Sequence, residues 1–135
     1  MRGDYLLIEG IGTDIVSVER IRAVALRRGD LFLQRVFTEG ELEYCLKRKD
    51  PYQCLAARFA AKEAVLKALG TGLLGCRWTD VEVVRSGSSP PEAHLSGNAG
   101  KLAGDRGIAR VLLSISHERD MAVAFALAIK GGNTV

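Results

Sequence analysis

The sequence predicts an α+β fold in which an antiparallel sheet packs against one long helix. Signals for helix starts and stops gather in the first half of the 135 residues, whereas the second half is mostly β-patterned. The two longest β-patterned segments, 109–116 and 121–130, are joined by the tight link 117–120, which is typical of an antiparallel pair. Helices early and antiparallel strands late indicate an α+β architecture and not a doubly wound one.

The first predicted element is a strand over residues 5–16 that has two different faces. One face carries Leu7, Ile11 and Ile15, and the other carries Ile8, Gly10, Gly12 and Asp14. Because glycine has no side chain, another group can approach the backbone closely on the face that holds Asp14.

Three helices and a short helical turn are expected between this strand and residue 70. The boundaries are 18–28 after the N-cap Ser17, a turn over 30–33, a helix from the capping box at 38–41 to about 48, and a helix from Asp50-Pro51 to Leu69. The last of these has about five turns and stops at Gly70.

The second half is expected to hold four strands and one short helix. The strands cover 81–85, 93–95, 109–116 and 121–130, and the helix covers 98–103. Residues 131–135 are expected to form a loose tail.

Size and composition fit one globular domain over residues 1–135. The longest apolar run, 121–129, is too short to cross a bilayer, and residues 1–4 lead into a strand without a cleavage site. Cys45, Cys54 and Cys76 are odd in number and contain no CxxC, so we expect three small buried hydrophobes and neither a disulfide framework nor a zinc site. These features favour a reducing, cytoplasmic location without membrane attachment.

The net charge is +3, and positive charge is dense at 20–28 and 47–49. Such local excess suits an acidic protein partner or a phosphorylated small molecule. It does not favour nucleic acid, because aromatic residues are few and do not interleave with the basic ones.

The long helix contains a carboxylate where the pattern predicts an apolar face. Leu55, Phe59 and Leu66 define that face, and Glu63 falls within it. A Glu63–Lys67 ion pair is the simplest explanation. Asp14 raises a second possibility, because two carboxylates from different elements beside a lysine suit Mg²⁺, which takes few protein oxygens and completes its shell with water and phosphate.

Three segments, in order, resemble the signature of the 4′-phosphopantetheinyl transferases, and specifically of the short holo-[acyl-carrier-protein] synthases. They are Gly12-Thr13-Asp14-Ile15, the stretch from Arg58 to Ala68 (RFAAKEAVLKA) followed by Gly70-Thr71-Gly72, and Ser114-Ile115-Ser116-His117. The first and third are weak alone, but the long central stretch is specific. The resemblance covers roughly residues 8–129.

This resemblance implies transfer of 4′-phosphopantetheine from coenzyme A to a serine of apo acyl carrier protein, with release of 3′,5′-ADP, in fatty acid or polyketide biosynthesis. It implies that Asp14 and Glu63 bind Mg²⁺ and that Lys67 stabilises charge on the departing phosphate. Glu63 is the candidate for taking the serine proton. The implied coenzyme A contacts are Arg58, Lys62, Gly70, Thr71, Gly72 and His117.

The resemblance also implies two kinds of protein partner. Arg20 and Arg27, seven residues apart on one helix face, would meet an acidic helix of the carrier protein. The chain would form a homotrimer with active sites at subunit interfaces.

Two other functions remain open on the residues alone. A non-catalytic module could present the basic helix 20–28 to an acidic partner, but Glu63 would then have no purpose. A small RNA-binding domain would need aromatic residues gathered on a sheet, and Tyr5 and Phe125 are too isolated. Magnesium-dependent consumption of coenzyme A separates the transferase from both.

Overall fold

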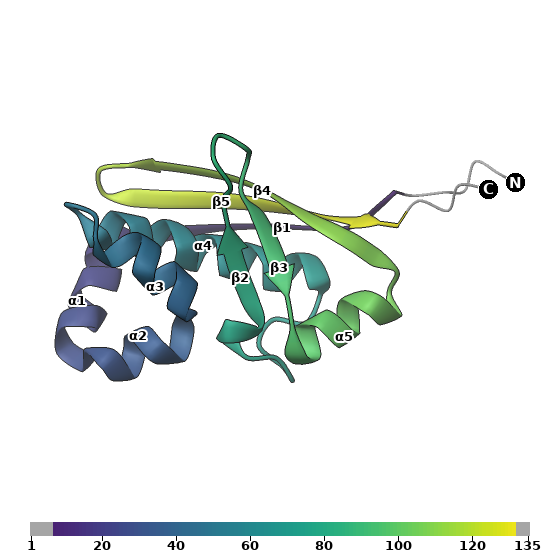
Figure 1. Cartoon of the computed structure of the whole chain (residues 1–135), viewed down its shortest axis with the longest axis horizontal. Coiled ribbons are helices and arrows are strands. Elements are labelled where there is room, and N and C mark those ends of the chain that lie inside the picture. Colours follow the sequence, from purple (N-terminus) through teal and green to yellow (C-terminus); the bar gives the residue numbers. More distant parts are fainter. Residues whose placement is uncertain (1–6, 132–135) are drawn as a thin grey trace, which may run out of the picture.

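The computed structural model describes residues 7–131, so Tyr5 and residues 132–135 of the expected tail lie outside the described part. The elements in chain order are β1 (Ile8–Ser17), α1 (Val18–Arg28), α2 (Asp30–Val36), α3 (Glu39–Leu46), α4 (Pro51–Leu69), a 3₁₀ turn (Trp78–Asp80), β2 (Val81–Val84), β3 (Glu92–Leu95), α5 (Gly97–Asp105), β4 (Ile108–Glu118) and β5 (Met121–Lys130) (Figure 1).

The helix boundaries follow the signals in the sequence. The side chain of Ser17 caps α1, Thr38 and Glu41 form the expected capping box of α3, and Asp50 caps α4. Gly70 ends α4 in the left-handed conformation with φ of 79°. Helix α2 continues to Val36, beyond the turn expected over 30–33.

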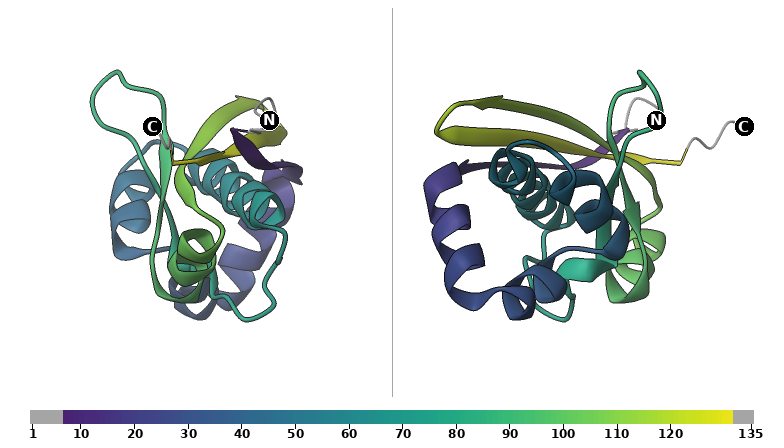
Figure 2. Two further views of the ribbon diagram at one scale, coloured as in Figure 1. Left: turned by 90° about the vertical axis from the view of Figure 1, so that its right-hand side faces the viewer. Right: turned by 60° about the vertical axis from the view of Figure 1, so that its left-hand side comes forward.

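The five strands form one antiparallel sheet in the order β1-β5-β4-β3-β2, which confirms the predicted α+β fold. Strands β4 and β5 make a long hairpin, in which His117 lies within β4 and pairs with Ala122. Strand β3 pairs with β4 only at Glu92↔Leu112 and Ala93↔Val111 before the two strands separate. The short β2–β3 hairpin therefore lies across the long β4–β5 hairpin (Figures 1 and 2).

Helix α4 lies against the inner face of β1, β4 and β5, and this contact forms much of the core (Figure 2). The contact is close because small side chains meet glycines. A Cβ added at Gly10 would overlap the carbonyl oxygen of Ala68, and one at Gly12 would overlap that of Ala64. The close approach expected on the Asp14 face of β1 is therefore the approach of α4 itself.

The outer face of the β1–β5 pair is apolar and exposed. Its exposed apolar side chains include Ile11 at 66%, Ile15 at 62% and Phe125 at 50%. Ile11 is opposite Leu127 and Ile15 is opposite Val123, so their side chains share this face. A contiguous apolar sheet face of this kind is typical of a protein–protein interface.

The cysteine prediction was wrong for two of the three residues. Cys45, at the end of α3, is disulfide-bonded to Cys54, in the first turn of α4, with a Cα–Cα distance of 5.4 Å. Cys76 is a free thiol and is half-buried. The spacing of the cysteines in the sequence could not predict this disulfide, because its formation depends on how α3 packs against α4.

No helix within residues 7–131 is long and apolar enough to cross a membrane.

Candidate active site

Asp14 on β1 and Lys67 on α4 meet across the glycine-lined contact between these elements. The ammonium group of Lys67 donates to the carbonyl oxygen of Thr13 at 2.9 Å and to Oδ1 of Asp14 at 3.2 Å. The Asp14 side chain is 14% exposed and that of Lys67 is 52% exposed, so the pair lies at the edge of the core with access to solvent.

Glu63 lies beside this pair and interacts electrostatically with both residues. Partial burial raises the pKa of Glu63 above its ordinary value, the negative charge of Asp14 raises it further, and the positive charge of Lys67 opposes both effects. The expected Glu63–Lys67 ion pair is wrong, because the close partner of Lys67 is Asp14.

The predicted position of Glu63 on the core face of α4 is also wrong. The helix is buried on nearly all sides, and between Leu55 and Leu69 every residue except Phe59, Glu63 and Lys67 is buried or nearly so. These three residues are four apart, so they form one open row along the helix. Glu63 is therefore a carboxylate in an open row that runs past Asp14, and the core does not enclose it.

The two carboxylates are suited to a hard cation with few protein ligands. Within residues 7–131 there is no group of three or more His, Cys, Asp or Glu side chains that could enclose an ion. Two carboxylates that repel each other still offer oxygens to a cation that keeps several waters and takes further oxygens from a phosphate. The arrangement therefore fits Mg²⁺ better than zinc, which prefers a closed set of nitrogen and sulfur ligands.

A separate cavity of about 570 Å³, which we call the basic cavity, lies between α3, α4, β4 and the β2–β3 turn. Its lining includes the cationic residues Arg48, Lys49, Arg58 and Arg85 and, from β4, the imidazole of His117. The predicted residues Arg58 and His117 are thus brought together. The lining does not include Asp14, Glu63 or Lys67.

Arg58 is held in this cavity with part of its hydrogen-bonding capacity unused. Its side chain is only 8% exposed, and its Nε atom has no partner among the described residues. The guanidinium carbon lies 4.2 Å from the ring centroid of Tyr44, and that of Arg48 lies 4.2 Å from the same centroid. Burial lowers the pKa of Arg58, and the neighbouring Tyr44 and Glu41 oppose this effect. An anion would supply the missing acceptor.

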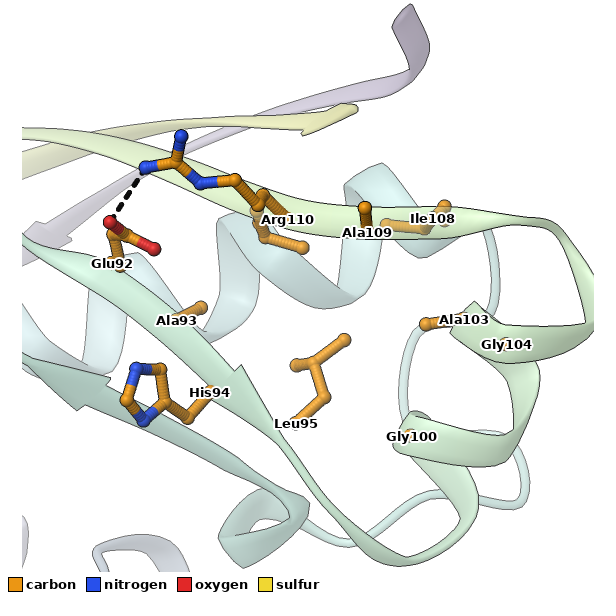
Figure 3. Close-up of a pocket in the computed structure, with 11 residues that line it drawn as sticks. Glu92, Ala93, His94, Leu95, Gly100, Ala103, Gly104, Ile108, Ala109 and Arg110 are labelled. Carbon is orange, nitrogen blue, oxygen red and sulfur yellow. Dashed lines mark hydrogen bonds and ion pairs between the residues drawn. The ribbon is translucent and has the colours of Figure 1, made fainter. Parts of the chain in front are cut away.

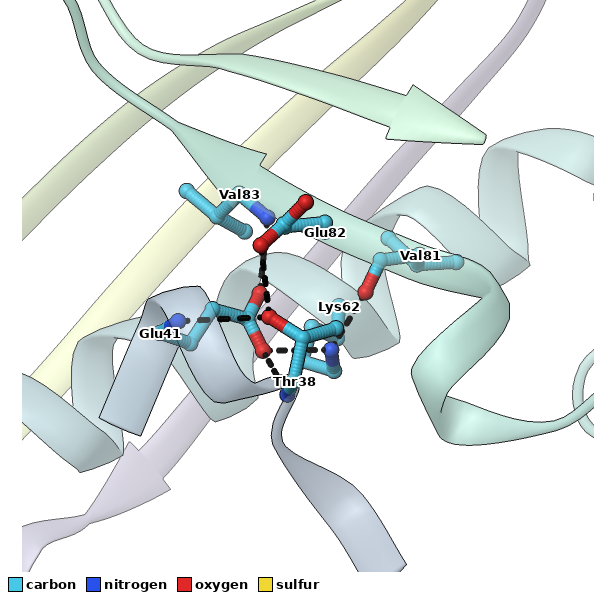
Figure 4. Close-up of polar contacts among 6 residues, drawn as sticks. All are labelled: Thr38, Glu41, Lys62, Val81, Glu82 and Val83. Atoms are coloured by element: carbon cyan, nitrogen blue, oxygen red, sulfur yellow. Dashed lines mark hydrogen bonds and ion pairs between the residues drawn. The ribbon is translucent and has the colours of Figure 1, made fainter. Parts of the chain in front are cut away.

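Lys62 does not reach a ligand site, which corrects its expected contact with coenzyme A. The side chain is fully buried, and its ammonium group donates to Glu41 Oε1 at 2.7 Å and to the carbonyl oxygen of Val81 (Figure 4). The second oxygen of Glu41 accepts from the backbone N–H of Val83 at 2.7 Å. Burial lowers the pKa of Lys62, although Glu41 opposes this effect. Lys62 therefore joins α4 to α3 and β2.

The segment Gly70-Thr71-Gly72 does not present its backbone N–H groups to a phosphate, which corrects a second expectation. The N–H of Gly70 donates to the carbonyl oxygen of Lys67 at 3.0 Å. The N–H groups of Thr71 and Gly72 both donate to the carbonyl oxygen of Leu66 at 3.3 Å. The segment is a C-terminal helix cap whose donors are already used.

Arg20 and Arg27 are both exposed on α1, as their spacing predicts. Among the described residues neither forms an ion pair. Arg22, in contrast, lies over the ring of Tyr52 at 5.2 Å. The exposed face carrying Arg20 and Arg27 therefore remains available to a partner.

A second cavity, of about 510 Å³, lies where β3 and β4 separate, and α5 covers it (Figure 3). Small side chains of α5 line one side, and Arg110 pairs with Glu92 at its edge with a distance of 2.7 Å. None of the predicted site residues lines this cavity. We therefore place the site at the carboxylates and the basic cavity.

Sequence analysis missed Tyr44 and Arg48 as cavity residues. The charge run 47–49 was a signal for Arg48, because it was interpreted as suited to an acidic protein partner or a phosphorylated small molecule, although no single residue of the run was named. Tyr44 had no signal, because its contact with Arg58 joins two helices across a loop.

Comparison with known proteins places the chain in a family of transferases. Residues 10–126 match the model of the 4′-phosphopantetheinyl transferase superfamily. The chain belongs to this superfamily.

Individual relatives are similar over nearly their whole length. A holo-[acyl-carrier-protein] synthase of Desulforudis audaxviator is 54% identical over 123 residues, which cover 91% of this chain and 94% of the relative. The crystal structure of the holo-[acyl-carrier-protein] synthase from Neisseria meningitidis is 40% identical with a TM-score of 0.84, covering 91% of this chain and 99% of that one. The synthase of Bacillus anthracis in complex with CoA (3′,5′-ADP) is 32% identical with a TM-score of 0.77, covering 93% and 100%.

Proposed function

We propose that this chain transfers the 4′-phosphopantetheine group of coenzyme A to a serine hydroxyl of apo acyl carrier protein. The reaction releases 3′,5′-ADP and depends on Mg²⁺. The observation that carries the proposal is the meeting of Asp14, Glu63 and Lys67 in an otherwise buried contact between β1 and α4. The similarity to synthases, one of them in complex with CoA (3′,5′-ADP), supports the choice of substrates.

Asp14 and Glu63 would hold the magnesium ion. Burial and then the negative charge of Asp14 raise the pKa of Glu63, and a bound cation would relieve the repulsion between the two carboxylates. When bound, Mg²⁺ would offset the negative charge of the pyrophosphate and make the phosphorus a better electrophile.

Glu63 and Lys67 would have different roles in the reaction, proton transfer for Glu63 and stabilisation of negative charge for Lys67. Glu63, in the open row of α4, would accept the proton of the attacking serine. Lys67 would stabilise the charge that develops on the departing 3′,5′-ADP phosphate, because its half-exposed ammonium group can reach outward from Asp14. While no phosphate is present, its bonds to Asp14 and Thr13 keep the ammonium group in place.

The basic cavity would bind the phosphorylated nucleotide part of coenzyme A. Arg58 is the main candidate, because its buried Nε has no partner among the described residues. His117 and Arg48 line the same cavity and would add donors. Lys62, Gly70, Thr71 and Gly72 are not part of this proposal, because their donors are used within the protein.

The active chain would be a homotrimer. The proposed metal-binding carboxylates do not line the basic cavity of the same chain. Coenzyme A could contact both if the basic cavity of one copy lay beside the carboxylates of the neighbouring copy. The exposed apolar face with Ile11, Ile15 and Phe125 supplies a surface on which copies could pack.

The carrier protein would dock on α1 through Arg20 and Arg27. Both guanidinium groups are exposed on one face of the helix, and helix α1 directly follows the strand that carries Asp14. An acidic partner would be attracted by this face and would bring its serine near the start of the helix.

The deciding experiment incubates the protein with coenzyme A, Mg²⁺ and an apo carrier protein, and weighs the carrier by mass spectrometry. We expect the carrier to gain one phosphopantetheine group and 3′,5′-ADP to appear in equal amount, with neither product formed when a chelator is present. Fatty-acid and polyketide carriers tested side by side would show which is preferred. A carrier that stays unmodified with both substrates and the metal present would contradict the proposal.

A further inference from the structure

The disulfide between Cys45 and Cys54 joins two helices beside the basic cavity. Its Cα–Cα distance of 5.4 Å lies within the usual range for a disulfide, so the backbone places the two residues in a bonding position. Cys45 is completely buried, whereas Cys54 is half-buried and lines the basic cavity.

The loop that this bond closes supplies one wall of the cavity. Arg48, Lys49, Asp50 and Gln53 all lie between the two cysteines and all line the basic cavity. The cationic groups of this wall therefore belong to a segment whose two ends are tied together by one covalent bond.

The bond is also adjacent to Tyr44, the residue whose ring contacts Arg58. Tyr44 directly precedes Cys45, and Arg58 lies one helical turn after Cys54. The ring of Tyr44 receives Arg48 and Arg58, each at 4.2 Å from the ring centroid. A movement of the end of α3 away from α4 would separate Tyr44 from Arg58 and release both guanidinium groups.

We propose that Cys45 and Cys54 form a reversible redox modification site that sets the affinity of the basic cavity for coenzyme A. The inference rests on the proposed function only in naming coenzyme A as the ligand. The disulfide form holds the cavity wall in its binding arrangement, and the dithiol form leaves it free to move. In the reducing compartment expected from the sequence, the dithiol is the resting form and oxidation increases affinity.

The chemistry is thiol–disulfide exchange with a small-molecule disulfide. The thiolate of Cys54, which is the accessible member of the pair, attacks one sulfur of the small disulfide and releases one small thiolate. The buried Cys45 then loses its proton and attacks the Cys54 sulfur of the mixed disulfide, which releases the second small thiolate. Two protein thiols are oxidised and one small disulfide is reduced to two thiols.

The higher affinity expected for the disulfide form follows from preorganisation of the cavity wall. A ligand that binds the dithiol form must also order the loop wall, whereas the disulfide form has already lost that freedom. Ordering even one backbone residue costs enough to weaken binding by about fivefold, so we expect at least that difference between the two forms.

The first measurement follows the bond itself and does not depend on the function. The full chain is equilibrated with mixtures of a small thiol and its disulfide, trapped with an alkylating reagent and weighed. We expect two thiols to disappear together, with the same midpoint in wild type and in Cys76→Ser. Loss of single thiols in an uncorrelated way, or a pairing that needs Cys76, would overturn the proposal.

The second measurement is calorimetry with 3′,5′-ADP, the nucleotide part of coenzyme A that has no thiol to react with the disulfide, on the oxidised and the reduced protein. We expect binding to weaken about fivefold or more on reduction, and Cys45→Ala to bind like the reduced protein under both conditions. Cys54→Ser is a second variant in case Cys45→Ala does not fold, with the same expected result. Equal affinity in both redox states would overturn the redox proposal alone, whereas no binding in either state would overturn the proposed coenzyme A site and the redox proposal with it.

Discussion

The ammonium nitrogen of Lys67 lies 3.2 Å from Oδ1 of Asp14, across the contact between a helix and a strand that are 53 residues apart in sequence at this point. The lysine is thus bonded to one carboxylate while it lies one helical turn from the other, Glu63. Two carboxylates lie near a single ammonium group, so the formal negative charge here exceeds the positive charge. A divalent cation would restore the balance.

We expect metal binding in the presence of coenzyme A to need both Asp14 and Glu63. Each carboxylate offers an oxygen to the ion, and either one alone leaves a largely hydrated ion weakly held. Calorimetry with Mg²⁺ and coenzyme A on Asp14→Asn and Glu63→Gln should show weakened metal binding in both, with Glu19→Gln on α1 as a control. Metal affinity equal to wild type in either variant would refute the assignment.

Lys67→Ala should reduce kcat by about 10²–10³-fold, because the lysine is proposed to meet charge that is present only in the transition state. The dissociation constant for coenzyme A should change little in comparison. Steady-state kinetics with direct binding measurements would separate the two effects, and Lys101→Ala, an exposed lysine of α5, is the matched control. A change confined to KM for coenzyme A would make Lys67 a ground-state contact.

The carboxyl group of Glu63 should titrate above its ordinary range in the metal-free protein, because burial and Asp14 both disfavour its charge. Asp14→Asn should lower this pKa, and Lys67→Met should raise it. Titration of the side-chain carboxyl carbon by NMR measures both shifts directly. An unchanged pKa in Asp14→Asn would show that the two carboxylates do not interact.

The same pKa shift implies a dependence of stability on pH. The folded protein holds the Glu63 proton more tightly than the unfolded chain does, so the stability from this effect is present at low pH and is lost as pH rises through the raised pKa. Glu63→Gln should therefore raise the melting temperature at neutral pH, with a gain that shrinks in acid. A destabilised Glu63→Gln at neutral pH would contradict this expectation.

The buried pair of Lys62 and Glu41 should matter for stability and not for contact with the substrate. Lys62→Met leaves the Glu41 carboxylate buried without its cation and should lower the free energy of unfolding by about 3–5 kcal/mol. Adding Glu41→Leu should recover much of this loss, although Val83 and Thr38 then lack an acceptor. Denaturant unfolding of the single and double variants measures both. If Lys62→Met weakened the affinity for coenzyme A and left stability unchanged, Lys62 would be a coenzyme A contact and the structural role would be refuted.

Charge reversal of Arg20 and Arg27 should weaken recognition of the carrier protein. Changing both to glutamate adds repulsion toward an acidic partner and should raise KM for the carrier by about tenfold or more at low salt. Binding of coenzyme A should not change, because neither arginine lines the basic cavity. Lys101→Glu, compared with each single reversal, controls for net charge. An unchanged KM would show that the partner docks elsewhere, with 47–49 the next surface to test.

Local signals were sufficient to predict most of the fold. Caps at Ser17, Thr38 and Asp50 and the stop at Gly70 gave the helix boundaries, because these residues act on backbone groups near them in the chain. The face of α4 was predicted wrongly, because alanines make this helix apolar nearly all round. A helix buried on most sides has no single stripe for periodicity to find.

The site was predictable only in part, for the same kind of reason. The sequence singled out Asp14, Glu63, Lys67, Arg58 and His117, and the structure brings the first three together and places the other two in the basic cavity. The residues that they contact could not be predicted, because those contacts form only when distant segments come together in the folded chain. Lys62 is bonded to Glu41, 21 residues away, and Cys45 to Cys54 across a turn. Neither choice leaves a local pattern in the sequence.

The close contact of Gly10 and Gly12 with α4 means that the spacing of the reactive groups is set by main chain against main chain. Side chains elsewhere in the core can be exchanged for others of similar volume, and the sheet will adjust around them. A single methyl group at either glycine would instead push the strand off the helix and carry Asp14 away from Glu63 and Lys67. The two positions without a side chain are thus as restrictive for the proposed chemistry as the three charged residues to which we assign it.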